Sequence, residues 1–192
     1  MKTFLREIGI IILLGVIISF LLQTTIQRFT VIGPSMEPSS HDGQQLITNK
    51  IVYHFHEPER GDVIIFYPPN QEQEVYIKRI IALPGDTVEI KEGIVYVSGS
   101  PLEEPYIKEP PRYTFQQYKI PPDSYFVLGD NRNNSHDSHN GWVVLRQNIV
   151  GKVWLSIWPP SKWGLIPTYP QEEQITEPMS KELSLLRRPE GA

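Results

Sequence analysis

The sequence contains no cysteine among its 192 residues. This absence excludes disulfide bonds, a thiol nucleophile and thiolate metal ligands, so a catalytic nucleophile is expected to be an oxygen. An excess of positive charge is also absent: the chain has 18 Lys and Arg residues and 22 Asp and Glu residues, so its formal net charge is −4. Such a chain offers no broad basic surface, and we expect no nucleic-acid partner. Alanine occurs only at Ala82 and Ala192.

Proline, in contrast, is abundant at 18 residues, which favours a loop-rich β protein over a helical bundle. One apolar run extends without charge from Ile8 to Leu22, and residues 23–26 lengthen it to about 19, enough for a bilayer-spanning helix. A cleaved secretory signal needs small residues in an A-x-A-like arrangement after such a run, whereas QTTIQRFTVIG follows here. We therefore predict an uncleaved anchor in the lipid bilayer rather than a signal peptide.

Charges around this run predict its orientation. Lys2 and Arg6 precede it with one acid, Glu7, and a short basic N-terminus tends to stay in the cytoplasm, even though Arg28 follows the run. Residues 1–28 are thus expected to form a cytoplasmic stub and a single-pass anchor, with the remaining chain outside the cytoplasm.

The sequence of the remaining chain predicts strands, since its apolar runs are short, rich in β-branched and aromatic residues, and bounded by Gly, Pro, Asn and Asp. The predicted strands are 45–53, 62–67, 75–83, 87–90, 94–97, 125–128 and 149–158. The clearest hairpin is TVEI-KEG-IVYV, because a three-residue connection ending in glycine supplies the positive φ that such loops need. The expected fold is mostly β, an antiparallel and barrel-like sheet domain behind one transmembrane helix.

The chain length suits one ordinary domain with an appendage. We assign this domain to residues 29–160, in which the proline-studded segment 101–122 is expected to be a loop or small flap over the sheets. Residues 161–192 are polar and broken by proline, and we predict a C-terminal tail there.

The stretch GPSMEP offers a candidate nucleophile, Ser35, soon after the apolar run. A serine hydroxyl becomes nucleophilic only when a base takes its proton. A Ser-His-Asp triad is one possibility, although the G-x-S-x-G elbow of many such enzymes has a glycine where this chain has Glu37. The histidines available for a triad are His41, His54, His56, His136 and His139.

A lysine is the second candidate base. Strand alternation in the segment 75–83 puts Lys78 on a mostly apolar face with Tyr76 and Ile80. Burial lowers the pKa of a lysine from its usual value of about 10.4 and frees the amine to act as a base. The alternative for Lys78 is a structural role on a solvent-facing strand, which is common for lysine.

A third candidate is the cluster GDNRNNSHDSHN at residues 129–140. Its His-Asp-x-His pattern suggests metal ligands, but no second cluster supplies the further ligand that a metal hydrolase needs. The cluster also fits a loop in which Asn and Asp side chains form local turns.

Four segments, in this order, resemble the conserved boxes of type I signal peptidases, the membrane-bound serine-lysine leader peptidases. GPSMEP resembles the nucleophile box S-M-x-P, RGDVIIFYP the strand after it, YIKRIIALPGDTVEI the general-base box, and GDNRNNSHDSH the last signature. Together they cover most of residues 33–140. The form NNS-x-DSH is most similar to cyanobacterial and plastid members.

The resemblance implies that Ser35 attacks the scissile carbonyl and that Lys78, as a neutral amine, accepts its proton. Ser135 is implied to orient this amine. The backbone N–H of Ser35 is implied to be an oxyanion donor, while Gly33 stands where many relatives carry a second donor, a serine hydroxyl. The family uses no metal or cofactor, and we expect none here.

Four charged residues are implied to shape the loop that holds Ser135: Asp130, Arg132, Asp137 and Arg79. Many relatives have an arginine that pairs with the aspartate at position 137, whereas this chain has His139. Histidine changes its charge near neutral pH, so this pairing is expected to depend on pH.

The family removes signal peptides from exported preproteins and cleaves after small residues at the first and third positions before the bond. The implied pocket walls are Phe29, Val31, Ile32, Met36, Ile65, Tyr76 and Ile77. The substrate is expected to add as an extended strand, in the plasma membrane or a thylakoid membrane.

Two other functions remain open from the residues alone. A self-cleaving serine-lysine protease of the SOS-repressor type is expected to carry a DNA-binding domain instead of an apolar anchor. A membrane-tethered β-barrel binding module would use Ser35 and Lys78 only as structural residues.

Overall fold

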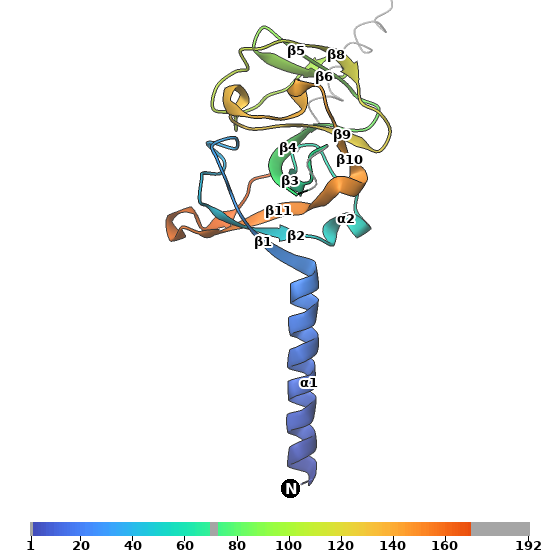
Figure 1. The fold of residues 1–192 in the computed structure, drawn as a ribbon, viewed down its shortest axis with the longest axis vertical. Coiled ribbons are helices and arrows are strands. Elements are labelled where there is room, and N and C mark those ends of the chain that lie inside the picture. Colours follow the sequence, from blue (N-terminus) through green and yellow to red (C-terminus); the bar gives the residue numbers. More distant parts are fainter. Residues whose placement is uncertain (1, 70–72, 170–192) are drawn as a thin grey trace, which may run out of the picture.

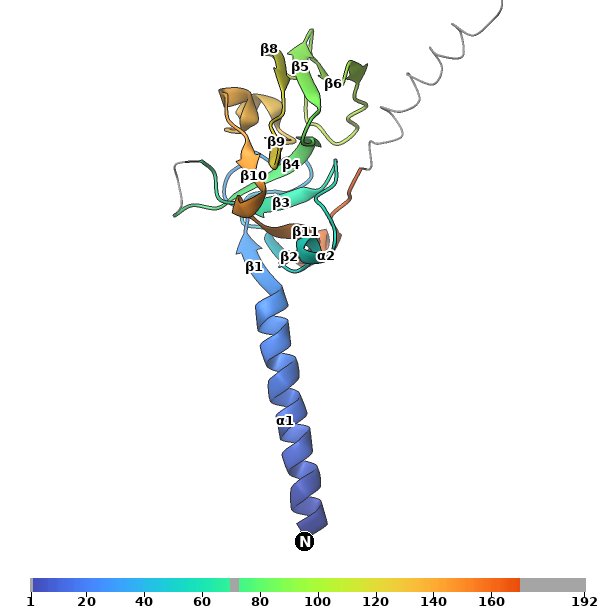
Figure 2. The same ribbon diagram turned by 90° about the vertical axis from the view of Figure 1, so that its right-hand side faces the viewer.

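The computed structural model describes residues 2–69 and 73–169. Its first element is a long helix, α1 (Lys2–Thr25), which projects from one end of a body of strands (Figure 1). The same helix still stands clear of the body after a quarter turn (Figure 2). Within the described ranges, α1 is the one helix that is long and apolar enough to cross a membrane, over Arg6–Thr25, and none of this span is buried in the protein.

The larger sheet is antiparallel and has eight strands in the described part of the chain. Their order is β1 (Ile26–Thr30), β2 (Gln45–Asn49), β11 (Ile149–Trp158), β3 (Val63–Phe66), β4 (Tyr76–Ala82), β9 (Ser124–Leu128) and β10 (Val144–Leu145), with β12 (Gly164–Leu165) paired to β11. Strands β3, β4 and β9 are buried on both faces apart from the first residue of β4, as expected for apolar runs at the centre of a sheet. The prediction of a mostly β, antiparallel fold is confirmed.

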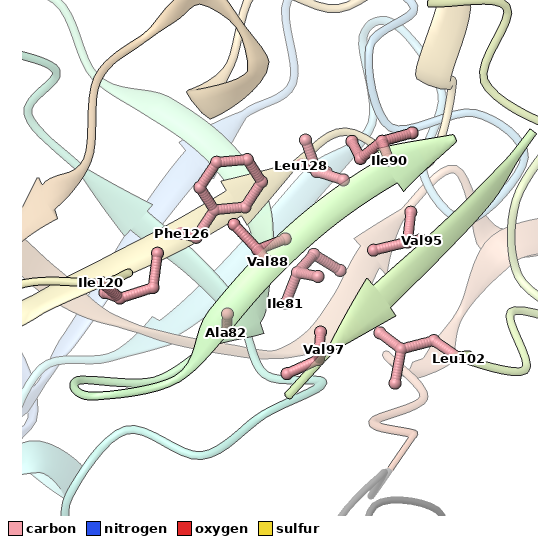
Figure 3. Packing of buried hydrophobic residues seen from close by; sticks show 10 residues of the cluster. All are labelled: Ile81, Ala82, Val88, Ile90, Val95, Val97, Leu102, Ile120, Phe126 and Leu128. Carbon is pink, nitrogen blue, oxygen red and sulfur yellow. The ribbon is translucent and has the colours of Figure 1, made fainter. Parts of the chain in front are cut away.

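A second sheet lies at the end of the body away from α1 (Figure 1). Its order is β7 (Ser100–Pro101), β6 (Ile94–Val97), β5 (Thr87–Lys91) and β8 (Phe115–Lys119). The predicted hairpin is confirmed, because β5 pairs with β6 from Val88 opposite Val97 to Lys91 opposite Ile94. Its connection is shorter than the predicted three residues, since Lys91 belongs to β5 and Glu92 and Gly93, both with positive φ, link the two strands. The core between the two sheets is built from aliphatic and aromatic side chains of β4, β5, β6 and β9 and their flanking loops. Figure 3 shows its ten buried residues: Ile81, Ala82, Val88, Ile90, Val95, Val97, Leu102, Ile120, Phe126 and Leu128.

Two strand predictions differ from the structure. The segment 101–122 contains a strand, β8, which pairs with β5; four of its five side chains are exposed, so it lacks the alternation that identifies a strand in sequence. The predicted strand 45–53 ends early, because the Asn49 side chain accepts hydrogen bonds from the N–H groups of Ile51 and Val52 and turns the chain into the short helix α2 (Val52–Phe55).

Short 3-10 helices complete the loops: η1 (Arg132–Asn134), η2 (Ser138–Asn140), η3 (Arg146–Asn148) and η4 (Pro160–Lys162). Part of the predicted tail packs against the body, since Ile166 is buried in the core beneath β2, β3, β4 and β11. The Arg79 guanidinium carbon lies over the Tyr169 ring, 5.3 Å from the ring centroid. Residues 170–192 of that segment lie outside the described residues.

Candidate active site

The predicted nucleophile and the predicted base meet although 43 residues separate them. Ser35 lies in the turn after β1, and Lys78 lies in the middle of β4. Lys78 Nζ is 2.8 Å from Ser35 Oγ, a hydrogen-bonding distance. Within the described residues, no histidine makes a hydrogen bond to this hydroxyl. The geometry therefore favours the lysine over the triad as the partner of Ser35.

Burial changes the protonation of Lys78. Its side chain is only 4% exposed, and desolvation lowers its pKa from 10.5 to about 8, although the nearby carboxylates of Asp137 and Asp130 act in the opposite direction. Near pH 8, about half of the molecules therefore carry a neutral amine, which can accept a proton. A solvent-facing strand lysine would have neither this burial nor this partner.

The loop that carries Ser35 is held by Asn131, a residue that the sequence analysis did not single out. The Asn131 backbone N–H donates to the Ser35 carbonyl at 3.0 Å, and its side-chain amide donates to the Pro34 carbonyl at 3.1 Å. Asn131 itself is buried. The two bonds fix the backbone on both sides of the Ser35 N–H, so Asn131 positions the loop without contacting the hydroxyl.

Gly129 separates the two serines of the site. A Cβ atom placed on Gly129 would lie 2.3 Å from Ser135 Oγ and 2.4 Å from the Ser35 carbonyl oxygen. Only glycine permits so close an approach of three segments. Ser135 is thus beside the Ser35 loop, but its buried hydroxyl makes no hydrogen bond in the described part of the chain. The expected bond from Ser135 to the Lys78 amine is not formed in this structure.

The backbone N–H of Ser35 is a candidate oxyanion donor. Within residues 2–69 and 73–169, the Ser35 N–H is engaged in no hydrogen bond, so it remains available to an oxyanion. The Gly33 N–H, in contrast, donates to Asp42 Oδ1 at 2.7 Å. Gly33 has a φ of +80°, which glycine adopts without strain, whereas a serine there would be in the disfavoured left-handed region.

Arg79 and Asp130, two of the expected supports, form a fully buried ion pair. Arg79 donates from Nε and Nη2 to the two Asp130 oxygens at 2.9 and 2.7 Å, and both side chains have no exposed surface. The third nitrogen of Arg79 donates to the Gly61 carbonyl at 2.8 Å. This pair joins β4, directly after Lys78, to the loop that holds Asn131.

Arg132 makes a second bidentate pair, with Glu104 of the segment 101–122, at 2.6 and 2.7 Å. Its Nε donates to the Gly129 carbonyl at 3.1 Å. The sequence analysis did not find Glu104, since nothing local relates it to the loop 28 residues later. Arg132 thereby ties this segment to the glycine between the two serines.

Asp137 also supports Gly129, because its carboxylate accepts the Gly129 N–H at 2.9 Å. Its other oxygen lies 2.7 Å from His139 Nδ1, so the histidine takes the place expected for an arginine. His139 stacks on Tyr113 with 4.2 Å between ring centroids, while His136 faces the rings of Tyr76 and Trp142. In the described part of the chain, no three His, Cys, Asp or Glu side chains come together as a metal site.

The dyad lies in a cleft of about 610 Å³. Six of the seven residues predicted as walls line it: Phe29, Val31, Ile32, Ile65, Tyr76 and Ile77. The seventh, Met36, does not line the cleft; it is fully buried and packs behind the wall against the core that includes Leu46. Four polar residues of the lining were not predicted: Thr30, Gln73, Glu74 and His136.

Comparison with known proteins identifies the family of the chain. The family described as "Signal peptidase, peptidase S26" matches residues 2–158. A relative from Synechocystis sp., named "Probable signal peptidase I-1", is 40% identical over 86% of this chain and 89% of its own length. "Thylakoidal processing peptidase 1, chloroplastic" from Arabidopsis thaliana is 38% identical over 67% of this chain and 41% of its own length.

A solved structure of a signal peptidase I from Enterococcus faecalis V583 is 33% identical, with a TM-score of 0.46; the match covers 50% of this chain and 97% of that one. The cyanobacterial and chloroplast relatives agree with the subfamily that the last signature resembles. The family match extends from the apolar helix through the last long strand, and the identity to the Synechocystis relative is 40% over most of the chain. The protein therefore belongs to the signal peptidase family, peptidase S26.

Proposed function

We propose that this chain removes signal peptides from exported preproteins, with Ser35 as nucleophile and Lys78 as general base. The observation that carries the proposal is the 2.8 Å distance between Lys78 Nζ and Ser35 Oγ on a lysine whose pKa burial lowers to about 8. A neutral amine at hydrogen-bonding distance meets the requirement for activating a serine.

In the first half of the reaction, Ser35 Oγ attacks the scissile carbonyl carbon and its proton passes to Lys78 Nζ. Negative charge then develops on the carbonyl oxygen, where the free Ser35 N–H donates a hydrogen bond. Collapse of this intermediate breaks the C–N bond, and Lys78 gives its proton to the departing amine of the mature protein. The signal peptide remains joined to Ser35 as an ester.

In the second half, a water molecule attacks the ester carbon while Lys78 accepts a proton from it. The C–O bond to Ser35 breaks, the hydroxyl regains a proton from Lys78, and the signal peptide leaves with a free carboxyl group. During these steps Ser135 is proposed to bond the Lys78 amine, since a buried hydroxyl without a partner gains from a cationic neighbour. Asp130, Arg132, Asp137 and Arg79 are proposed to hold the loop behind it.

The cleft supports a preference for small side chains before the scissile bond. Its walls near the dyad are largely apolar, and Ile65 and Ile77 lie at its base with little exposed surface. Within the described strands, Ile77 and Lys78 pair with β3 on one side, while the pairing with β9 begins only at Arg79. We propose that an extended peptide adds along the other side of these two residues, so that strand addition provides affinity and the walls provide selection.

We further propose that α1 anchors the enzyme in the plasma membrane or a thylakoid membrane, with its N-terminus in the cytoplasm. The apolar span Arg6–Thr25 is about 30 Å long at 1.5 Å per residue, which matches the hydrocarbon core of a bilayer. Since β1 follows α1 directly, we expect the cleft to lie beside the membrane surface that faces away from the cytoplasm.

A preprotein cleavage assay tests the dyad. Ser35→Ala and Lys78→Ala are each expected to abolish processing without unfolding the protein, while the matched controls Ser39→Ala and Lys119→Ala, a nearby serine and an exposed lysine, retain it. Full activity in either dyad variant would remove the catalytic assignment.

The absence of cysteine makes the orientation easy to test. Single cysteines introduced as Thr3→Cys and Lys119→Cys should react with a membrane-impermeant maleimide from opposite sides of the membrane. Labelling of both from the same side would contradict the proposed single span.

A further inference from the structure

A second cavity, of about 410 Å³, lies where α1 joins the body. It is separate from the catalytic cleft and shares none of its lining residues. Its lining comes from the end of α1, the loop before α2, α2 itself, the start of η3 and the start of β11: Thr24, Lys50, Ile51, Tyr53, His54, Arg146, Ile149 and Val150. Its volume is in the range of small-ligand sites.

The charged groups of this cavity are basic. Lys50 and Arg146 line it together with the ring of His54, and no acidic side chain is in the lining. The Lys50 amine has no ion-pair partner in the described part of the chain. Arg146 bonds the Tyr53 carbonyl and pairs with Glu57 at 3.2 Å, but the Glu57 side chain is 81% exposed, and exposed pairs contribute little. The cavity therefore favours a small anion.

The position of the cavity relative to α1 indicates where such an anion comes from. Thr24, in the last turn of the apolar span, is part of the lining, and the Lys50 N–H donates to the Thr25 carbonyl at 2.9 Å. Figures 1 and 2 both show α2 at the end of the body nearest α1. This helix also carries Phe55, an apolar side chain that is 76% exposed.

We propose that this cavity binds the phosphate of an anionic phospholipid headgroup between Lys50, Arg146 and His54. The proposal rests on the membrane-spanning role of α1, which brings the cavity to the level of the headgroups. Phosphate oxygens accept hydrogen bonds from the lysine and arginine, and the acyl chains of the lipid lie along the apolar surface of α1. The bound lipid fixes the height of the body, and with it the cleft, relative to the bilayer.

The test uses the full chain with Ser35→Ala, so that the readout is independent of cleavage. The protein is placed in nanodiscs that contain phosphatidylcholine and phosphatidylglycerol, released, and examined by native mass spectrometry for retained lipid. One phosphatidylglycerol per chain is expected. Lys50→Gln should lower its occupancy about fivefold, the effect of one cation near an anionic surface, and Lys50→Arg should keep it.

Arg28→Gln is the matched control, because Arg28 is an exposed cation on β1, equally near α1 but outside the cavity. An equal loss in Arg28→Gln and Lys50→Gln would show diffuse attraction to the surface and overturn the site. Entry into nanodiscs without preference for phosphatidylglycerol would also overturn it. Failure to enter nanodiscs at all would overturn both the anchor and the site, while leaving the dyad untouched.

Inorganic phosphate distinguishes a lipid headgroup from a soluble anion. In nanodiscs of phosphatidylcholine alone, inorganic phosphate is expected to bind the protein weakly, as followed by phosphorus NMR. Tight phosphate binding that depends on Lys50, together with no retained phosphatidylglycerol, would replace the lipid by a soluble phosphate and contradict the proposal.

Discussion

Replacing Gly129 with alanine should separate the proposed nucleophile from its base. The added Cβ would lie 2.4 Å from the Ser35 carbonyl oxygen, whereas ordinary contact begins at 3.4 Å, so one of the two backbones has to move by about 1 Å. On its other side the Cβ meets Ser135 Oγ at 2.3 Å, so movement in that direction is blocked as well. Rotation of the Ser135 hydroxyl moves only its Oγ, whereas the Ser135 Cβ at 2.7 Å and the Ser35 carbonyl oxygen can give way only by a shift of their backbones.

A shift of this size is large for the chemistry. The hydrogen bond from Lys78 to Ser35 is 2.8 Å long, and lengthening it by about 1 Å removes it. A displacement of about 1 Å in a catalytic group costs roughly 10²-fold in rate. We therefore expect Gly129→Ala to lower kcat/KM for a preprotein about 100-fold, while overpacking lowers the free energy of unfolding by only about 1–3 kcal/mol.

The assay compares steady-state cleavage of a purified preprotein with urea unfolding of the same variant. Gly151→Ala is the matched control, because its Cβ would meet the Asn49 carbonyl at 2.3 Å, a similar clash in β11 outside the cleft lining. This control should lose stability but keep kcat/KM in its folded fraction. Near wild-type kcat/KM for folded Gly129→Ala would refute the reasoning.

Three further predictions concern the loop and the dyad. Asp130→Asn leaves the buried Arg79 cation without its carboxylate and should lower the free energy of unfolding by about 3–5 kcal/mol in urea titrations; a loss below about 1 kcal/mol would contradict a buried pair. Asn131→Ala removes one hydrogen bond to the Ser35 loop and should lower kcat less than about tenfold with little change in KM, whereas a change in KM alone would argue against a positioning role. Lys78→Met should raise the free energy of unfolding at pH 7 by about 3 kcal/mol, because the unfolded chain, with a pKa of 10.5, binds the proton more tightly than the folded chain, with a pKa of about 8. Wild-type stability should accordingly rise between pH 8 and 10.5, and this rise should be missing in Lys78→Met.

Much of the fold could be predicted from the sequence because its central strands have strong local signals. The runs at β3, β4, β9 and β11 are apolar and β-branched, and the glycine of the β5–β6 connection marks a tight hairpin. The polar edge strand β8 could not be predicted in this way, since it is held by pairing with β5 rather than by a buried face of its own. Strand β1 continues directly from α1, so no break in the sequence separated it from the apolar run.

The site could be predicted in its residue types but not in its geometry. The resemblance selected Ser35 and Lys78, yet no local pattern relates residues 43 positions apart. Strand alternation correctly separated Lys78 from Arg79, which bonds Asp130 in the loop after β9. The support from Asn131 and Glu104 depends on long-range packing, and the sequence carried no periodic signal for it.

The protonation of Lys78 is the central claim, and its pKa can be measured directly. The full chain in nanodiscs, with carbon-13 at the lysine Cε atoms, can be titrated by NMR, and the Lys78 signal can be assigned by its loss in Lys78→Met. We predict that this signal titrates with a pKa of about 8, because burial disfavours the charged amine. A titration near 10.5, as for a lysine in water, would mean that Lys78 is protonated at working pH and cannot activate Ser35.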